Sequence, residues 1–231
     1  MANYVLTKRE YMNKYVSSLK IISEELLMFN DELIGSHTFY EDNGIVIEVE
    51  VYANLNNLTI IRTNDDAYIP TKGFVKVDEL FSRENIISGN IRVTDFILEG
   101  TDGIGKSTSI ERLLREGIVC LDRNLDVICK YMLFDVPMEK RIREYKKYLE
   151  STNDKILFLV NMDKEELKKR IYARDVISEF DRYSVEYNQM YYDTFNEMKK
   201  MDYLYGKLFL LDCTNLTEIE QKEKIKEILL R

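Results

Sequence analysis

Apolar and polar positions follow one pattern in the first part of the chain and another in the rest. In residues 45–51 apolar side chains alternate strictly with polar ones, which predicts a half-buried strand. Residues 58–62 and 74–77 are two further strand candidates. Residues 8–29 carry apolar side chains at helical spacing, which favours an amphipathic helix. We therefore expect residues 1–92 to form a small α+β module of one helix and antiparallel strands.

From residue 93 onward, strand patterns alternate with helix patterns, as is typical of parallel α/β structure. The expected strands cover residues 95–99, 117–121, 156–160 and 208–212. The expected helices cover residues 107–115, 138–149, 164–174, 185–201 and 218–230. The sequence thus predicts an α/β fold in residues 93–231, in which helices flank a sheet of about four parallel strands.

One segment carries recognisable chemistry. Gly100, four further residues, Gly105, Lys106 and Ser107 match the phosphate-binding loop pattern, between an apolar strand and an amphipathic helix. We call residues 99–108 the glycine loop. Backbone N–H groups can converge on phosphate oxygens only where side chains are absent, and a helix N-terminus adds partial positive charge. We expect Lys106 to bridge the terminal phosphates of ATP, and the Ser107 hydroxyl to bind Mg²⁺.

The nucleotide-binding residues predicted from this pattern are Gly100, Asp102, Gly103, Ile104, Gly105, Lys106, Ser107 and Thr108.

The glycine loop, EGTDGIGKST, resembles the loop of thymidylate kinases and related deoxynucleoside kinases. Asp122 and Arg123, directly after a predicted strand, are similar to an Asp-Arg pair of that family. Tyr131 stands where the family has a substrate-site tyrosine. Residues 157–174 resemble the strand, helix and basic lid that follow, so the resemblance covers about residues 95–230.

The resemblance implies a P-loop fold, ATP and Mg²⁺ as cofactors, and a homodimer. It implies that Asp102 binds a sugar hydroxyl, Arg123 the acceptor phosphate, and Tyr131 the sugar or base. Asp122 would lie near the magnesium ion. Arginines of the lid would neutralise charge on the transferring phosphoryl group. The candidates for this last role are Arg170 and Arg174, with Arg182 less favoured.

The chain also departs from the family pattern. Only 15 residues separate Ser107 from Asp122, which leaves room for one short helix and one strand. The family has another strand there, with an arginine for the acceptor phosphate, and Arg62 is one candidate replacement. A deoxynucleoside monophosphate, thymidylate-like, is the favoured acceptor, because an acceptor phosphate needs no general base. Three alternatives remain: a deoxynucleoside kinase, a kinase of modified bases in DNA, and a non-catalytic nucleotide-binding module.

Composition narrows these choices. The formal net charge of −8, from 33 basic and 41 acidic residues, disfavours nucleic acid as a partner. The only histidine, His37, lies in a polar stretch typical of a surface loop, which excludes a histidine-based catalytic triad. Three cysteines without close spacing do not describe a disulfide framework or a zinc site. No apolar run is long enough to cross a membrane, and no secretory signal is present, so we expect a cytoplasmic protein with a small-molecule nucleotide substrate.

Overall fold

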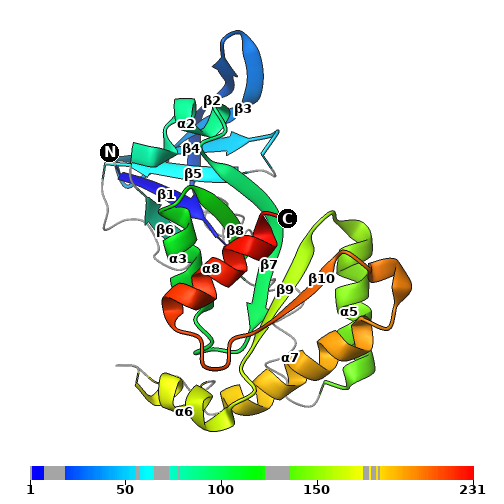
Figure 1. Ribbon diagram of the computed structural model, residues 1–231. Coiled ribbons are helices and arrows are strands. Elements are labelled where there is room, and N and C mark those ends of the chain that lie inside the picture. Colours follow the sequence, from blue (N-terminus) through cyan, green and yellow to red (C-terminus); the bar gives the residue numbers. More distant parts are fainter. Residues whose placement is uncertain are drawn as a thin grey trace. The chain divides into compact units, whose positions relative to one another are not determined.

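The computed structural model describes residues 2–7, 19–55, 58–64, 73–77, 79–122, 136–173, 177, 181 and 183–231. The chain divides into two compact units (Figure 1). The first, which we call the N-terminal unit, consists of Met1–Thr94 and Leu113–Val119. The second, the C-terminal unit, consists of Asp95–Arg112 and Cys120–Arg231.

The N-terminal unit contains a six-stranded antiparallel sheet with the strand order β2-β3-β4-β5-β1-β6. The strands are β1 (Ala2–Leu6), β2 (Lys20–Phe29), β3 (Glu32–Asp42), β4 (Ile45–Tyr52), β5 (Leu58–Thr63) and β6 (Phe74–Val77). A single turn of 3₁₀ helix, Glu79–Phe81, and the short α2 helix, Arg83–Ile87, follow the sheet. The three strands predicted in residues 45–77 are confirmed. Apolar side chains on one sheet face form the core of this unit, among them Tyr4, Tyr40, Ile47, Val49 and Ile61.

The helix predicted for residues 8–29 is wrong where the structure describes it, because residues 20–29 form strand β2. Residues 8–18 lie outside the described residues. Strand β2 pairs with β3 along its whole length, through a tight turn at Asn30 and Asp31 with φ values of 49° and 65°. Ile22 and Leu26, which would lie on the buried face of the helix, are 52% and 70% exposed. Their spacing therefore does not mark a buried face.

His37 also differs from its prediction as a surface-loop residue. It lies in the middle of β3, opposite Glu50 of β4, and only 12% of its side chain is exposed. Its Nε2 atom is 3.6 Å from a carboxylate oxygen of Glu48. The turn that follows, at Asn43 and Gly44, has positive φ at both residues and joins β3 to β4 as a hairpin. The polar stretch is therefore a strand and a turn.

The C-terminal part of the chain forms a four-stranded parallel sheet with the order β10-β9-β7-β8. Its strands are β7 (Arg92–Gly100), β8 (Ile118–Asp122), β9 (Lys155–Val160) and β10 (Leu208–Asp212). Its helices are α3 (Lys106–Leu114), α5 (Met138–Ser151), α6 (Lys164–Tyr172), α7 (Ser184–Met198) and α8 (Glu218–Leu229). The predicted alternation of four strands and five helices is confirmed, with boundaries that differ by a few residues.

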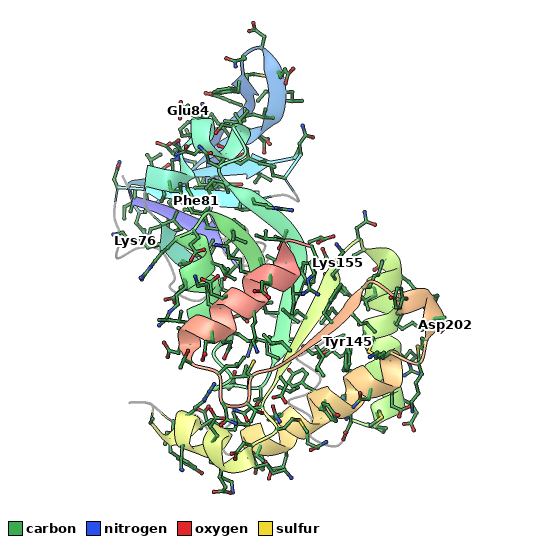
Figure 2. The ribbon with its side chains drawn as sticks, in the orientation of Figure 1. Lys76, Phe81, Glu84, Tyr145, Lys155 and Asp202 are labelled. Atoms are coloured by element: carbon green, nitrogen blue, oxygen red, sulfur yellow. The ribbon has the colours of Figure 1, made fainter. Side chains whose placement is uncertain are left out.

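Helices cover the two faces of this sheet, which explains why β9 is apolar along its length. Ile156, Phe158 and Val160 pack against the helices α5 and α7. The ring of Tyr145, labelled in Figure 2, points from α5 toward β9 and meets Phe158 edge-on, with 5.6 Å between the ring centroids. The intervening residues of β9 face the other way and are also fully buried. Among the described residues, no helix is long and apolar enough to span a membrane.

Candidate functional site

The glycine loop joins the end of β7 to the start of α3. Gly100 has a φ of +150°, and a Cβ atom there would stand 2.6 Å from the carbonyl oxygen of Leu159. Gly103 has a φ of +82°, and a Cβ atom there would stand 2.5 Å from Cγ1 of Ile171. Any other residue would meet both backbone strain and a steric clash at these positions. The two glycines let the loop pack directly against β9 and α6.

Hydrogen bonds to the helices α7 and α8 hold the loop in place. The Thr101 hydroxyl donates a hydrogen bond to the backbone carbonyl of Ser184, the first residue of α7, at 2.9 Å. The Gln221 side-chain amide, on α8, donates to the backbone carbonyl of Ile104 at 2.8 Å. The Ile104 side chain is fully buried. The loop therefore has a defined shape that depends on residues far away in the sequence.

Lys106 points back into the loop rather than into solvent. Its Nζ atom donates to the carbonyl oxygens of Gly100 and Thr101, at 2.8 and 2.9 Å, and the residue is 5% exposed. A cation is thus held inside a turn of main chain at the N-terminus of α3. This position gives it access to an anion bound at the same turn.

The side-chain oxygens of Ser107, the residue after Lys106, and of Asp122 lie close together. The Ser107 hydroxyl donates to Oδ2 of Asp122, the last residue of β8, at 3.1 Å. No cluster of three or more His, Cys, Asp or Glu side chains that could hold a metal occurs in the described part of the chain. Mg²⁺ bound together with nucleotide phosphates needs only one or two protein oxygens, and hydroxyl and carboxylate oxygens are suitable ligands. The pair fits that requirement.

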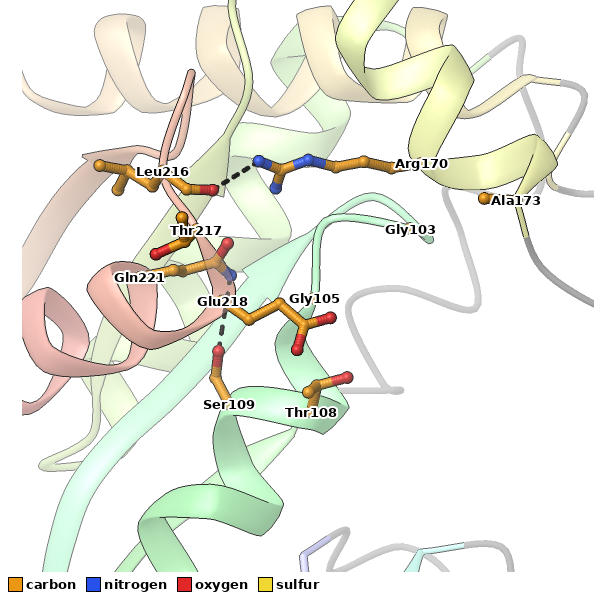
Figure 3. Close-up of a pocket in the computed structure, with 10 residues that line it drawn as sticks. All are labelled: Gly103, Gly105, Thr108, Ser109, Arg170, Ala173, Leu216, Thr217, Glu218 and Gln221. Carbon is orange, nitrogen blue, oxygen red and sulfur yellow. Dashed lines mark hydrogen bonds between the residues drawn. The ribbon is translucent and has the colours of Figure 1, made fainter.

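A cavity of about 490 Å³ lies beside the glycine loop, and Figure 3 shows its walls. Three parts of the chain line it: the loop with the first turn of α3, the end of α6, and the start of α8 with the residue before its cap. The lining residues are Gly103, Gly105, Thr108, Ser109, Arg170, Ala173, Leu216, Thr217, Glu218 and Gln221. Four of them belong to the glycine loop and the first turn of α3, so the cavity and the loop form one site.

Arg170 forms part of the cavity wall, and its guanidinium has fixed partners. It donates to the carbonyl oxygen of Leu216 at 2.7 Å, as Figure 3 shows, and forms an ion pair with Glu166 one turn earlier on α6. Sequence analysis identified Arg170 as a lid residue that closes over the transferring phosphoryl group. In this structure its guanidinium contacts Glu166 of α6 and the segment that leads into α8, and its role in the lid stays a prediction.

Glu166 connects this contact to the end of β9. Its carboxylate accepts hydrogen bonds from the side-chain amide of Asn161 at 2.9 Å and from the backbone N–H of Asn215 at 3.0 Å. Burial alone would raise the pKa of Glu166, but these hydrogen bonds and the one from Arg170 outweigh it and lower the pKa below its usual value. The ionised carboxylate therefore helps to hold Arg170, which does line the cavity.

Asn161 is itself fixed by α7. The Asn188 side chain accepts a hydrogen bond from the backbone N–H of Asn161 at 2.9 Å and donates to its carbonyl at 2.8 Å. Both residues are buried. The tyrosines of α7 serve packing, as expected: Tyr187 and Tyr191 belong to the core between α5, α7 and β9. Burial, followed by the electrostatic effects of Tyr183, Asp102 and Glu186, raises the pKa of Tyr187.

Four predicted site residues lie outside the described residues: Arg123 and Tyr131 of the acceptor site, and the lid candidates Arg174 and Arg182. Their predicted roles stay predictions. The described residues thus cover the glycine loop, the Ser107–Asp122 pair and the cavity.

Arg62, the candidate replacement for an acceptor-site arginine, is engaged within the N-terminal unit. It forms an ion pair with the fully buried carboxylate of Glu50, at 3.1 Å. The same carboxylate pairs with Arg83 at 2.7 Å and accepts the Tyr52 hydroxyl at 2.9 Å. Burial, followed by the charge of Glu50, raises the pKa of Tyr52. This arrangement gives Arg62 a structural partner.

No protein-family model matches the chain, and no curated protein is significantly similar to it. The resemblance to thymidylate kinases therefore rests on the sequence motifs alone.

Sequence analysis did not identify Gln221, Glu166 or Asn161 as parts of the site. A signal for Gln221 is present in the sequence: it shares a helical face with Ile225 and Leu229, all three of them buried, so a polar residue occupies a core position of α8. No comparable signal marks Asn161 or Glu166, because Asn161 meets Asn188 of α7 and Glu166 meets Asn215, both distant in the sequence.

Proposed function

We propose that this protein binds ATP with Mg²⁺ at the glycine loop and transfers its γ-phosphoryl group to a deoxynucleoside monophosphate, with thymidylate as the favoured acceptor. One observation carries the proposal. Lys106 and the Ser107–Asp122 oxygen pair lie at the N-terminus of α3, and a cavity of about 490 Å³ opens on the other side of the same helical turn, at Thr108.

The phosphate end of the ligand belongs at the glycine loop. The first backbone N–H groups of a helix have no partner within the helix and are favourable for anions, and α3 begins at Lys106. On binding, Lys106 would exchange the carbonyls of Gly100 and Thr101 for phosphate oxygens and neutralise part of their charge. Ser107 and Asp122 would hold Mg²⁺, which neutralises the charge that develops during phosphoryl transfer.

The nucleoside end belongs in the cavity. Its volume lies in the range of about 300–1,000 Å³ that is typical of small-molecule sites. Ala173 and Leu216 supply apolar surface for a base, and the guanidinium of Arg170 supplies a planar cation over which an aromatic ring can stack. Thr108, between the loop and the cavity, is placed for the first phosphate and the sugar.

The acceptor assignment rests on the motif resemblance. Asp102 lies in the loop next to Lys106 and, with Arg123 and Tyr131, is the proposed binding set for the monophosphate. A phosphate acceptor is already a competent nucleophile, so the residues need only hold it in line with the γ-phosphoryl group.

A non-catalytic nucleotide-binding module is the second candidate. One observation favours it: Ser107 and Asp122 are 15 positions apart, and the segment between them holds only α3 and β8, without the additional strand that carries an acceptor-site arginine in the family.

Turnover distinguishes these candidates. The full chain is incubated with ATP, Mg²⁺ and a panel of deoxynucleoside monophosphates, deoxynucleosides and DNA oligonucleotides, and ADP release is measured. We expect release with monophosphates, fastest with thymidylate. Lys106→Ala should lower the rate by at least about 100-fold, because a cation aimed at the transferring phosphates is lost.

Lys168→Ala is the matched control, since Lys168 is an exposed lysine of α6 paired with Glu165, and its removal should leave the rate unchanged. ATP binding without ADP release from any acceptor would support the binding module instead. A chain that does not bind ATP would contradict both candidates.

A further inference from the structure

Gln221 is a buried polar residue with a contact that packing alone does not require. It is 2% exposed and lies on the buried face of α8. Its Nε2 atom donates to the carbonyl of Ile104 at 2.8 Å and lies 3.5 Å from the hydroxyl of Ser109. One side-chain amide thus contacts both the middle of the glycine loop and the first turn of α3.

The loop also packs against this amide. Gly105 has a φ of +88°, and a Cβ atom there would stand 3.0 Å from Nε2 of Gln221. A side chain at position 105 would therefore crowd Gln221, and glycine allows the close contact. Because a buried amide without a partner is destabilising, the hydrogen bond to Ile104 is favoured over its loss.

The helix that carries Gln221 is well anchored on the same side. Thr217 caps α8, with its hydroxyl and the Glu220 carboxylate satisfying each other's backbone N–H groups. Glu218 forms an ion pair with Arg112 of α3. The start of α8 is thus held in place relative to α3, and Gln221, one turn further along, transmits that position to the loop.

We propose that Gln221 is a positioning residue that holds the glycine loop in the shape required to bind phosphate oxygens. The inference rests on the proposed function, and it concerns only the phosphate end of the ligand. Gln221 fixes the carbonyl of Ile104, so the neighbouring backbone N–H groups of the loop are already oriented before the ligand binds. Binding then costs less conformational entropy. Gln221 also lines the cavity, so its loss should weaken binding of the polyphosphate more strongly than binding of the nucleoside.

The test compares three probes by calorimetry: ATP with Mg²⁺, inorganic tripolyphosphate with Mg²⁺, and adenosine. Gln221→Leu removes the donor and keeps most of the volume. We expect its affinity for ATP and for tripolyphosphate to fall by about tenfold, and its affinity for adenosine to fall by much less. Gln221→Met, unbranched like glutamine, gives the same comparison with a smaller change of shape if the leucine variant does not fold.

Thr194→Val is the matched control. Thr194 is equally buried in α7, and its hydroxyl donates to the carbonyl of Met190 at 2.7 Å, so the variant also loses one buried hydrogen bond. It should leave all three affinities unchanged. Equal affinities in Gln221→Leu and the wild type would overturn the proposal, and so would a parallel loss of adenosine affinity, which indicates general disruption of the site.

A second measurement needs no ligand. Backbone amide hydrogen exchange of residues 101–107 should be at least about tenfold faster in Gln221→Leu than in the wild type and in Thr194→Val. Unchanged exchange in this segment would contradict the positioning role even if ATP binding is weakened. If the wild-type chain binds none of the three probes, the proposed function fails, and the exchange experiment still decides the role of Gln221.

Discussion

Gly103 shows how strongly a single residue of the site depends on its surroundings. Its φ of +82° is unfavourable for any residue with a Cβ atom, and Ile171 of α6 fills the space where that atom would be. Gly206, near the start of β10, has almost the same φ of +83° and has no atom within 4 Å of the Cβ position. Comparing substitutions at the two glycines therefore distinguishes the cost of backbone strain from the cost of a steric clash.

Replacing each of them by alanine measures the two costs. Gly206→Ala should lower the free energy of unfolding by about 1 kcal/mol through backbone strain alone. Gly103→Ala should lower it by a further 1–3 kcal/mol, roughly the cost of overpacking a filled site, and should weaken ATP binding. Urea denaturation of both variants checks this. Equal losses in the two variants would show that α6 yields to the added methyl group.

Glu166 makes the stability of the C-terminal unit dependent on pH. Its pKa in the folded protein is lowered from the usual 4.5 by the hydrogen bonds from Asn215, Asn161 and Arg170, which outweigh burial. A lowered pKa stabilises the fold at pH values above the usual one, and this contribution is lost as the pH falls from about 4.5 to the folded-state value.

Glu166→Gln should therefore be less stable than the wild type at neutral pH, and the difference should shrink below about pH 4.5. Urea unfolding of both proteins at a series of pH values measures it. A difference that stays constant down to the lowest pH would mean that the charge of Glu166 does not contribute to stability.

Residues of the site differ in how far sequence alone predicts them. Lys106 and Ser107 follow from a local pattern, because the strand, the loop and the helix that position them are contiguous. Gln221 and Ile104 lie 117 positions apart, and no local pattern indicates that they meet. Arg170 was a candidate residue of the site, and its pairing with Glu166 follows from helical spacing, but its hydrogen bond to the carbonyl of Leu216 depends on how distant segments pack.

At the scale of elements, β2 is the main difference between sequence and structure. Spacing of three and four between Leu19, Ile22 and Leu26 favours a helix, and β2 carries no regular alternation that competes with it. The decisive signals lie in the turns: Asn30–Asp31 and Asn43–Gly44 both have positive φ, which sets up successive hairpins. Pairing of β2 with β3 then overrides the helical spacing.

Two adjacent leucines test whether β2 is a strand. Leu26→Lys should change the free energy of unfolding by less than about 0.5 kcal/mol, since Leu26 is 70% exposed. Leu27→Lys should destabilise by at least about 3 kcal/mol, because Leu27 is 2% exposed and an unpaired charge would be buried there. Thermal unfolding distinguishes them. A larger loss for Leu26→Lys would support the helix instead.

Strands and helices of the C-terminal unit were predicted more successfully. Strands β8, β9 and β10 each contain an uninterrupted apolar run of four or five residues, and the helices between the strands are amphipathic, so both patterns are strong. The order of the strands was not predictable in the same way. Strand β9 lies between β7 and β10 because two helices cover one of its faces, and this depends on packing between distant segments.

At the scale of the whole molecule, the chain is acidic, with a net charge of −8. Each unit has its own core, and the residues of the candidate site that the structure describes all belong to the C-terminal unit. A DNA duplex binds proteins chiefly through basic residues that release its counterions. The acidic charge therefore disfavours DNA among the alternative acceptors.

We expect no binding of a DNA duplex of about 20 base pairs at micromolar protein and about 0.15 M salt, measured by fluorescence anisotropy. The same protein should bind ATP with Mg²⁺ under these conditions. Tight duplex binding with a steep salt dependence would favour the kinase of modified bases in DNA over the mononucleotide kinase.

The enclosed position of Lys106 also governs its chemical reactivity. An amine-directed acylating reagent needs an accessible nitrogen, and this nitrogen is buried and hydrogen-bonded to two carbonyls. In a labelling time course, Lys106 will be among the last lysines to be modified. The rate at which the acylated peptide containing Lys106 appears therefore measures how often the glycine loop opens.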